Sequence, residues 1–168
     1  MTAAPTAAPT AAPTIADPAA TPAPLAERRR WMAVLARAGA AELRAALAEL
    51  DPTPGWLRLK GPEVGLIMLR GRMGGDGAPF NLMEATATRC TLRLDSGAMG
   101  HATILGRDPE KAELAALFDA LLQDPARRPR LLERLIEPLA RAQAAARQAR
   151  ARKAASTRVQ FFTLAAMR

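Results

Sequence analysis

The hydrophobic pattern predicts two short helices soon after residue 25. Apolar residues that recur three or four positions apart lie on one side of an α-helix. This spacing occurs in two sets, Trp31, Val34, Leu35 and Ala38, then Leu43, Ala46, Leu47 and Leu50. The sequence DPTPG at 51–55 then ends the second helix, because proline lacks the amide donor that a helix interior needs.

The pattern changes to that of β-strands between residues 56 and 105. Four segments are rich in apolar and β-branched residues: 56–60, 64–69, 80–94 and 98–105. Turn-forming sequences separate them, namely Gly61-Pro62, Gly74-Gly75-Asp76-Gly77 and Asp95-Ser96-Gly97. Such short connections join neighbouring strands as antiparallel hairpins. The strand at 64–69 is apolar on both faces.

Helical spacing returns after residue 108. Asp108 is placed to cap the free amides of a first turn, and Pro109 suits the first helical position, which needs no donor. An apolar stripe wide enough to cover a sheet face follows, formed by Leu114, Leu117, Phe118, Leu121 and Leu122. Helical spacing continues through 131–136 as far as Pro138, which we expect to kink or break the helix.

The C-terminal part of the chain is predicted to reach outward. Between residues 140 and 155 the only apolar residues are alanines, set among the cations Arg141, Arg147, Arg150, Arg152 and Lys153. A helix that is polar on all sides has little of its own to bury and depends on a partner. A short strand is predicted at 159–164, where Phe161 and Phe162 point to opposite faces and are expected to dock on another subunit.

These elements predict an α+β fold. We expect an antiparallel sheet of about four to five strands packed by helices, with helical arms and a C-terminal strand for subunit docking. Residues 1–24 are rich in Ala, Pro and Thr, include three tandem AAPT repeats, and are predicted to be a disordered low-complexity tail. Residues 25–168 have the length of a single domain.

Composition excludes several classes of site. With one cysteine, Cys90, and one histidine, His101, the chain cannot form an internal disulfide, or a complete structural zinc or iron-sulfur site alone. No segment approaches the roughly 20 consecutive apolar residues that span a membrane, and no signal segment opens the chain. We therefore expect a cytoplasmic protein with no metal centre of its own. Cys90 fits a small core residue better than a nucleophile.

The net charge of +8 arises almost wholly after residue 125. Residues 1–125 carry 13 Lys and Arg against 14 Asp and Glu, whereas 126–153 carry 9 against 2. Such a basic segment could neutralise nucleic-acid phosphates. It has no aromatic residue for base stacking and matches no groove-reading motif, so a solvated or subunit-facing helix is favoured. A genomic bias toward arginine and alanine explains the composition equally well.

A glycine-rich loop at 71–79 is the first candidate for binding chemistry. Gly74 and Gly75 leave backbone amides unhindered beside Arg72, an arrangement that suits a phosphate or phosphonate oxygen. The loop has neither the lysine and hydroxyl of a phosphate loop nor a dinucleotide fingerprint. We favour a plain hairpin turn and keep anion binding as the alternative.

Polar residues also occur inside segments that otherwise resemble buried strands. Alternation places Glu84 and Thr88 on the same face as core residues, so the carboxylate should pair with an arginine or face a cavity. The possible partners are Arg72, Arg89 and Arg107. We favour a structural ion pair over acid–base catalysis, which would require geometry with a substrate.

His101 is predicted to be a half-buried, hydrogen-bonded strand residue, because no local motif places a nucleophile beside it. Arg107 follows the strand and is available to bind an anion or a partner carboxylate. No residue is assigned a catalytic role. The candidate substrate-proximal or interface residues are Arg72, Gly74, Gly75, Glu84, Thr88, Arg89, His101, Arg107 and Asp108.

At these residues the chain resembles the PhnG family, whose members are subunits of the bacterial phosphonate carbon-phosphorus lyase core complex. Several blocks in order carry the resemblance: RWMAVLARA at 30–38, PEVGLIMLRGRMGGDGAPFNLMEATATRC at 62–90, GHATILGRD at 100–108, LAALFDALLQDP at 114–125 and TRVQFFT at 157–163. The chain departs from the family pattern at Met83, where a glycine is expected, in its AAPT tail, and in the ending LAAMR.

The resemblance implies a protein that functions only as part of a multi-subunit complex. Its implied partners are the lyase subunits H, I and J, and the implied reaction transfers the ribose triphosphate moiety of MgATP to a phosphonate and releases adenine. An iron-sulfur cluster and S-adenosylmethionine belong to the J subunit, so no cofactor is expected on this chain, and the isolated chain is expected to be inactive. The implied role is structural or co-catalytic. The alternatives are a pure scaffold, whose polar residues make only subunit contacts, and a less favoured nucleic-acid-binding protein.

Overall fold

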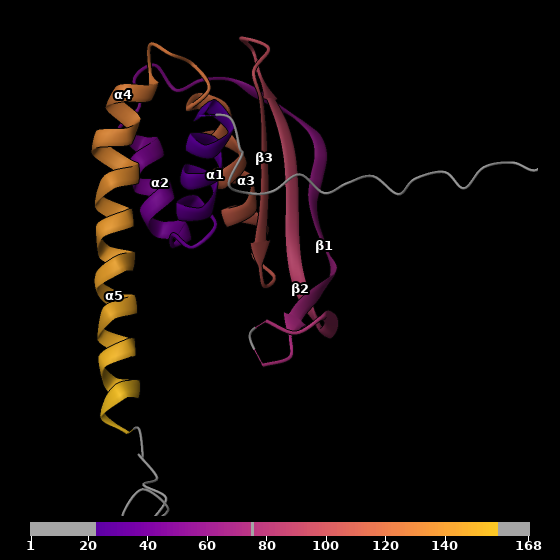
Figure 1. Cartoon of the computed structure of the whole chain (residues 1–168). Coiled ribbons are helices and arrows are strands. Elements are labelled where there is room, and N and C mark those ends of the chain that lie inside the picture. The colour runs from indigo at the N-terminus through magenta and orange to yellow at the C-terminus, as the bar shows by residue number, and fades with distance from the viewer. Residues whose placement is uncertain (1–22, 75, 158–168) are drawn as a thin grey trace, which may run out of the picture.

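A three-stranded antiparallel sheet with helices on one face forms the core of the protein (Figure 1). The computed structural model describes residues 23–74 and 76–157. The predicted α+β class is confirmed. The elements in order are α1 Ala23–Leu35, α2 Ala40–Ala48, β1 Trp56–Arg72, β2 Pro79–Leu94, β3 Met99–Leu105, α3 Pro109–Leu121, α4 Arg128–Leu131, the π-helix η2 Leu132–Ile136, and α5 Glu137–Ser156.

The first two predicted strands are one continuous strand, β1. The expected turn at Gly61-Pro62 is wrong, because the chain passes this point with a shift of register against β2. Lys60 pairs with Thr91 and Glu63 with Arg89, which leaves one extra residue in β1, as in a β-bulge. The missing amide of the proline is tolerated there because β1 is an edge strand.

The strand count follows from this merger. The sheet has the order β1-β2-β3, and both neighbouring pairs are antiparallel. The fifth predicted strand, with Phe161 and Phe162, lies outside the described residues, as does most of the predicted tail. The described part of the chain therefore contributes three strands to the predicted four or five.

Helix boundaries follow the sequence signals at one point and depart from them at another. The carboxylate of Asp108 accepts a hydrogen bond of 3.0 Å from the amide of Lys111, so the predicted cap of α3 is confirmed. Pro138 was expected to kink or break the helix, and it does not break it, since α4, η2 and α5 follow one another without interruption. The wider π-helical turn just before the proline changes the hydrogen-bond ladder where a donor is missing.

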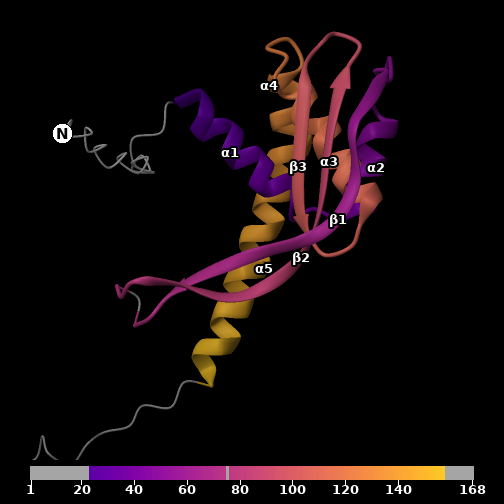
Figure 2. The same ribbon diagram turned by 90° about the vertical axis from the view of Figure 1, so that its right-hand side faces the viewer.

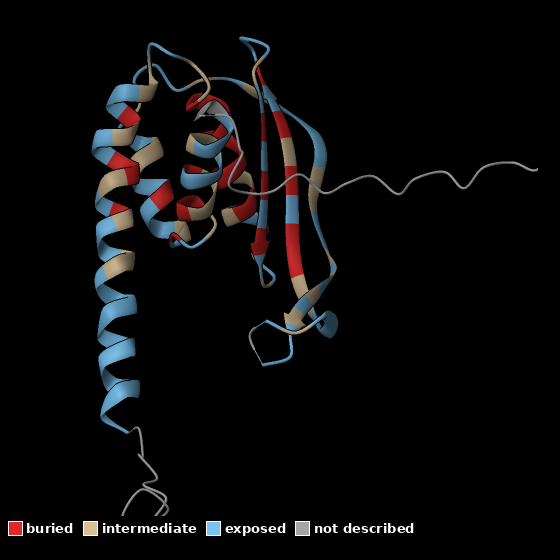
Figure 3. Ribbon diagram, viewed as in Figure 1, coloured by how far each residue is buried: buried red, intermediate tan, exposed pale blue. Residues whose placement is uncertain are grey.

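The core lies between the sheet and α3, with α1 on the outer side of α3. Figure 3 shows buried residues on the strands and on α3, and also on the helices packed behind α3, whereas the distal half of α5 is exposed. Leu117 and Phe118 of α3 are fully buried, together with Leu92 of β2. Burying such side chains stabilises a fold by about 1.5–3 kcal/mol each. The opposite face of the sheet has no helix over it among the described residues (Figure 1).

Strand β3 approaches α3 very closely at Gly100. A Cβ at this position would collide with the carbonyl oxygen of Ala116 and lie 2.8 Å from the amide nitrogen of Ala120. The absence of a side chain lets the two backbones meet. As a result, the amide of the next residue, His101, donates a 3.0 Å hydrogen bond to Asp119 on α3.

Asp119 is a fully buried carboxylate that joins three elements. Besides the amide from β3, it accepts 3.1 and 2.7 Å bonds from the Nε and Nη2 of Arg28, and a 2.9 Å bond from the indole of Trp31. Its hydrogen bond raises the pKa of the Arg28 guanidinium above its ordinary value, against the opposing effect of burial. The carboxylate thus ties α1 and β3 to α3.

A second carboxylate, Glu113, ties β1 to α3. It accepts bonds of 2.8 Å from Arg58 Nε and 2.9 Å from the indole of Trp56. Burial alone would raise the pKa of Glu113, but these hydrogen bonds outweigh it and hold the pKa below its ordinary value. The ionised form is therefore the one that the fold stabilises.

Replacing Asp119 is expected to destabilise the protein strongly. Asp119→Asn keeps the shape but leaves Arg28 without its anion, so the free energy of unfolding should fall by about 2–4 kcal/mol. Urea unfolding measures this loss. Glu110→Gln, which removes the exposed ion pair with Arg44, should leave the urea midpoint nearly unchanged; equal losses in the two variants would contradict the role of Asp119.

The protein is also expected to lose stability as the pH is lowered, and the protonation of Glu113 should account for part of this loss. Because its folded pKa is depressed, the stabilisation is complete above the unfolded pKa and is lost as the pH falls through the folded pKa. Unfolding curves between about pH 6 and about pH 3 should therefore show a smaller loss of stability in Glu113→Gln than in the parent. An identical loss in both proteins would show that Glu113 does not contribute.

Candidate functional site

The β1–β2 hairpin extends beyond the helices as an arm, here defined as residues 63–86 (Figure 2). None of its described residues is buried. Several large apolar side chains on it are 41–74% exposed: Val64, Leu66, Met68, Met73, Phe80, Leu82 and Met83. Exposed apolar side chains gathered in one region mark a surface that meets a partner.

Both faces of the arm carry apolar residues. The register pairs Leu66 with Thr86, and so places them on one face, whereas Leu69 pairs with Met83 on the other. A two-stranded ribbon by itself is marginally stable in water. The arm therefore exposes apolar side chains on both faces of a ribbon that is marginally stable alone.

The tip of the arm is a hairpin turn, which was the favoured interpretation of the glycine-rich loop. The guanidinium of Arg72 donates a 3.1 Å hydrogen bond to the carbonyl of Gly77, whose amide donates one of 2.9 Å to the carbonyl of Met73. Gly74 has φ +65°, a left-handed conformation that favours glycine. Gly75 lies outside the described residues. Anion binding at this loop stays a prediction.

Glu84 lies on the arm, exposed, and opposite Met68 in the register. The ion pair expected with Arg72, Arg89 or Arg107 does not form within residues 23–74 and 76–157. Alternation identified the correct face of the strand, but the helices that cover this face end before residue 84. The carboxylate therefore faces solvent in this chain.

Thr88 is buried and organises the turn between β3 and α3. Its hydroxyl donates a 2.7 Å hydrogen bond to the carbonyl of Gly106 and accepts one of 3.2 Å from the amide of Asp108. Gly106 has φ +95°, which permits the sharp exit from the strand. The side chains of Thr88 and Asp108 are thus engaged in hydrogen bonds that stabilise this turn and the start of α3. Arg107, just before Asp108, is exposed at the surface.

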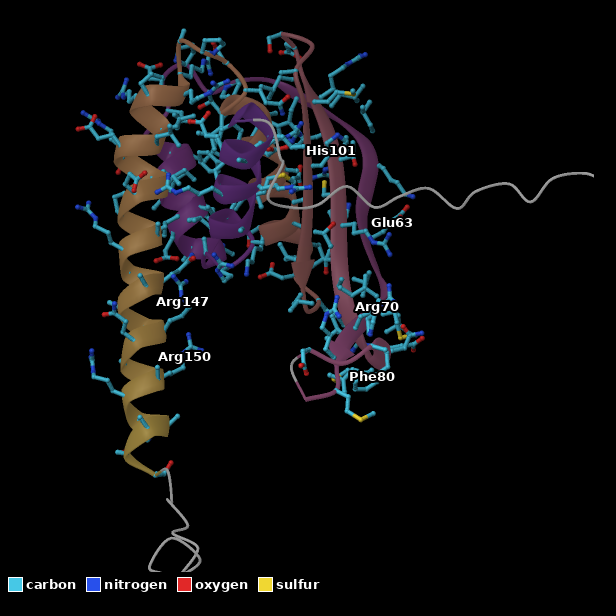
Figure 4. All side chains as sticks on the ribbon, in the orientation of Figure 1. Glu63, Arg70, Phe80, His101, Arg147 and Arg150 are labelled. Carbon is cyan, nitrogen blue, oxygen red and sulfur yellow. The ribbon has the colours of Figure 1, made fainter. Side chains whose placement is uncertain are left out.

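Arg89 and His101 lie on the sheet face opposite the helices. His101 is exposed, not half-buried as expected, and its Nδ1 lies 3.1 Å from the hydroxyl of Thr91. Figure 4 shows His101 and, farther out on β1, Glu63. Arg89 is opposite Glu63 on one side and Thr103 on the other. This open face combines these polar groups with the exposed apolar side chains of Leu57, Met99 and Leu105. A mixed surface of this kind suits contact with another protein surface.

Cys90 is a buried core residue. Burial raises the pKa of its thiol, and the nearby carboxylate of Glu113 raises it further. A neutral, covered thiol is a poor nucleophile. Within the described residues, no three His, Cys, Asp or Glu side chains are grouped where they could hold a metal ion, and no helix has the length and apolar character to cross a membrane.

The candidate residues do not converge on one catalytic cluster. The structure distributes them over the arm tip, the open sheet face and the turn before α3. Asp119 and Glu113, both of which organise the fold, were not among the residues expected from the sequence. The signal that could have found them was a carboxylate within the apolar stripe of α3, since such a residue must find buried donors.

Two comparisons with known proteins give the same answer. The family model described as "Phosphonate metabolism protein PhnG" matches residues 26–166. The protein named "Alpha-D-ribose 1-methylphosphonate 5-triphosphate synthase subunit PhnG" from Rhizobium meliloti (strain 1021) is 46% identical over 142 residues, which cover 84% of this chain and 90% of that protein. The similarity therefore includes the arm, the open face and α5.

Proposed function

Because the chain belongs to the PhnG family of phosphonate metabolism proteins, we propose that it is a subunit of an α-D-ribose 1-methylphosphonate 5-triphosphate synthase. The observation that carries this proposal is the 46% identity to such a subunit over 90% of that protein's length. Similarity of this extent covers all the surfaces described above.

The product in the relative's name is a ribose that carries a methylphosphonate at position 1 and a triphosphate at position 5. We propose MgATP as the source of the ribose triphosphate. A phosphonate oxygen attacks the ribose carbon of MgATP that carries adenine; the new carbon–oxygen bond forms as the bond to adenine breaks, and the triphosphate stays on the ribose. We propose that the lyase subunits H, I and J are the partners in a cytoplasmic hetero-oligomer, with later carbon-phosphorus scission on J, which holds the iron-sulfur cluster and S-adenosylmethionine. This chain then binds no cofactor alone.

The arm supports a role in assembly. Its apolar side chains face solvent on both sides of a two-stranded ribbon, a form that gains stability when other surfaces cover it. Covering side chains such as Leu66 and Met68, which are 59% and 50% exposed, would contribute about 1–2 kcal/mol each to association. We propose that the arm packs against another subunit of the synthase.

We propose that any co-catalytic contribution comes from exposed side chains that carry nitrogen. Thr88 and Asp108 are occupied by backbone groups, whereas Arg89, His101 and Arg107 keep side-chain nitrogens at the surface. Such groups can bind an anionic substrate oxygen when a neighbouring subunit closes the site. A pure scaffold, in which the same residues only contact subunits, is the alternative.

The first experiment tests whether the complex needs this chain. Co-expression with subunits H, I and J is expected to give a stable assembly that releases adenine from MgATP and methylphosphonate, and omission of the chain should abolish release. The isolated chain is expected to release none. Substituting Arg89 and Arg107 then separates the two roles: an intact but slow complex indicates participation in the site, whereas parallel loss of assembly and activity indicates a scaffold.

Polar substitution of the arm is expected to weaken assembly without unfolding the chain. Leu66→Ser with Met68→Ser removes exposed apolar groups, so the melting temperature of the chain should stay the same while affinity for the other subunits falls at least about tenfold. Affinity capture with tagged subunits measures the loss. The matched control is Leu25→Ser, which changes an exposed leucine on α1; an equal effect there would argue against the arm.

A further inference from the structure

A basic recess of about 720 Å³ lies where α5 passes the ends of α1 and β3. Four cations line it, Arg37 after α1, Lys111 in the first turn of α3, and Arg147 and Arg150 on α5. Thr103 and Leu105 of β3, Gln143 of α5 and several alanines complete the lining. Figure 4 shows Arg147 and Arg150 directed from α5 toward the side on which the sheet lies.

No carboxylate lines this basic recess. At the joints between elements, by contrast, arginine is paired with a carboxylate, as in Arg30–Glu137 and Arg44–Glu110. None of the four cations forms an ion pair within the described ranges. Like charges that share a recess repel one another. An anion bound among them would remove this cost.

The protein holds part of this recess in place. The amide group of Gln143 donates a 3.0 Å hydrogen bond to the carbonyl of Val34 and accepts one of 3.1 Å from Arg37 Nε. This arrangement leaves the terminal nitrogens of Arg37 available and fixes α5 against α1. Arg147 and Arg150 follow Gln143 by four and seven residues, so the three share one face of the helix.

We propose that the basic recess binds the triphosphate group of the nucleotide substrate or of the ribosyl product. The proposal rests on the proposed function, because the relative's name specifies a 5-triphosphate. Guanidinium, ammonium and hydroxyl donors are the groups that bind phosphate oxygens. The volume lies in the range of small-molecule sites, roughly 300–1,000 Å³. Cations from three separate elements converge here, which suits a compact polyanion better than an extended acidic segment.

Binding of inorganic tripolyphosphate to the full chain tests the proposal. At fixed ionic strength, calorimetry is expected to show saturable binding that weakens at least about tenfold in Arg147→Gln with Arg150→Gln. The matched control is Arg141→Gln with Arg152→Gln, which removes the same charge from the same helix outside the lining. MgATP should compete with tripolyphosphate, and orthophosphate at the same ionic strength should compete poorly. Thermal melts check that both variants stay folded.

Three results would overturn the proposal: no saturable binding, equal weakening in recess and control variants, or equal binding of orthophosphate. A recess variant that binds tripolyphosphate normally but no longer joins subunits H, I and J would assign the recess to an acidic partner surface instead. These results are distinct from failure of the proposed function. A chain that neither assembles nor supports adenine release would contradict that function, whereas loss of tripolyphosphate binding alone concerns only the recess.

Discussion

The buried carboxylate of Asp119 connects the parts of this protein that are far apart in sequence. It accepts hydrogen bonds from Arg28 and Trp31 on α1 and from the backbone of β3, while itself standing on α3. A buried carboxylate without donors would cost several kcal/mol, so the donors must arrive together if the fold is to form. The missing side chain of Gly100 permits the close contact between β3 and α3 on which one of these bonds depends. The position of α1 then sets where α5 can lie, through Arg30–Glu137 and Gln143.

Two parts of the chain, the arm and the distal half of α5, extend beyond this core. The helices cover one sheet face as far as the point where the arm begins, and beyond it the strands continue with apolar groups on both sides. At the other end, every residue of α5 and the position after it from 145 to 157 is exposed. Two-stranded ribbons and helices without an apolar face gain little stability by themselves. Such extensions are consistent with a family whose members are subunits, because another surface supplies what each extension lacks.

Charge is divided in the same way. Where elements meet within the chain, arginines are matched by carboxylates: Arg28 by Asp119, Arg44 by Glu110 and Arg58 by Glu113. In the basic recess the cations have no such match, although Gln143 holds Arg37 in position. The arginine–carboxylate pairs hold elements of the fold together, whereas the cations of the recess can attract an anionic ligand. The net charge of +8 is therefore a property of surfaces that the core does not use.

Local sequence patterns were enough to establish the α+β class, the capped start of α3 at Asp108, two of the three predicted hairpin turns, and the apolar character of both faces of 64–69. These depend on residues close to one another in the chain, where spacing and backbone preference act directly. Other features depend on the packing of distant segments. Pairing with β2 converted Gly61-Pro62 from an expected turn into a bulge, and the extent of helical cover left Glu84 and His101 exposed. Alternation with a period of two shows which residues share a face of a strand. It does not show which of the two faces a distant helix will cover, or how much of that face. The convergence of residues 28, 101 and 119, and of 37, 111 and 147, likewise depends on contacts across the chain that local patterns do not specify.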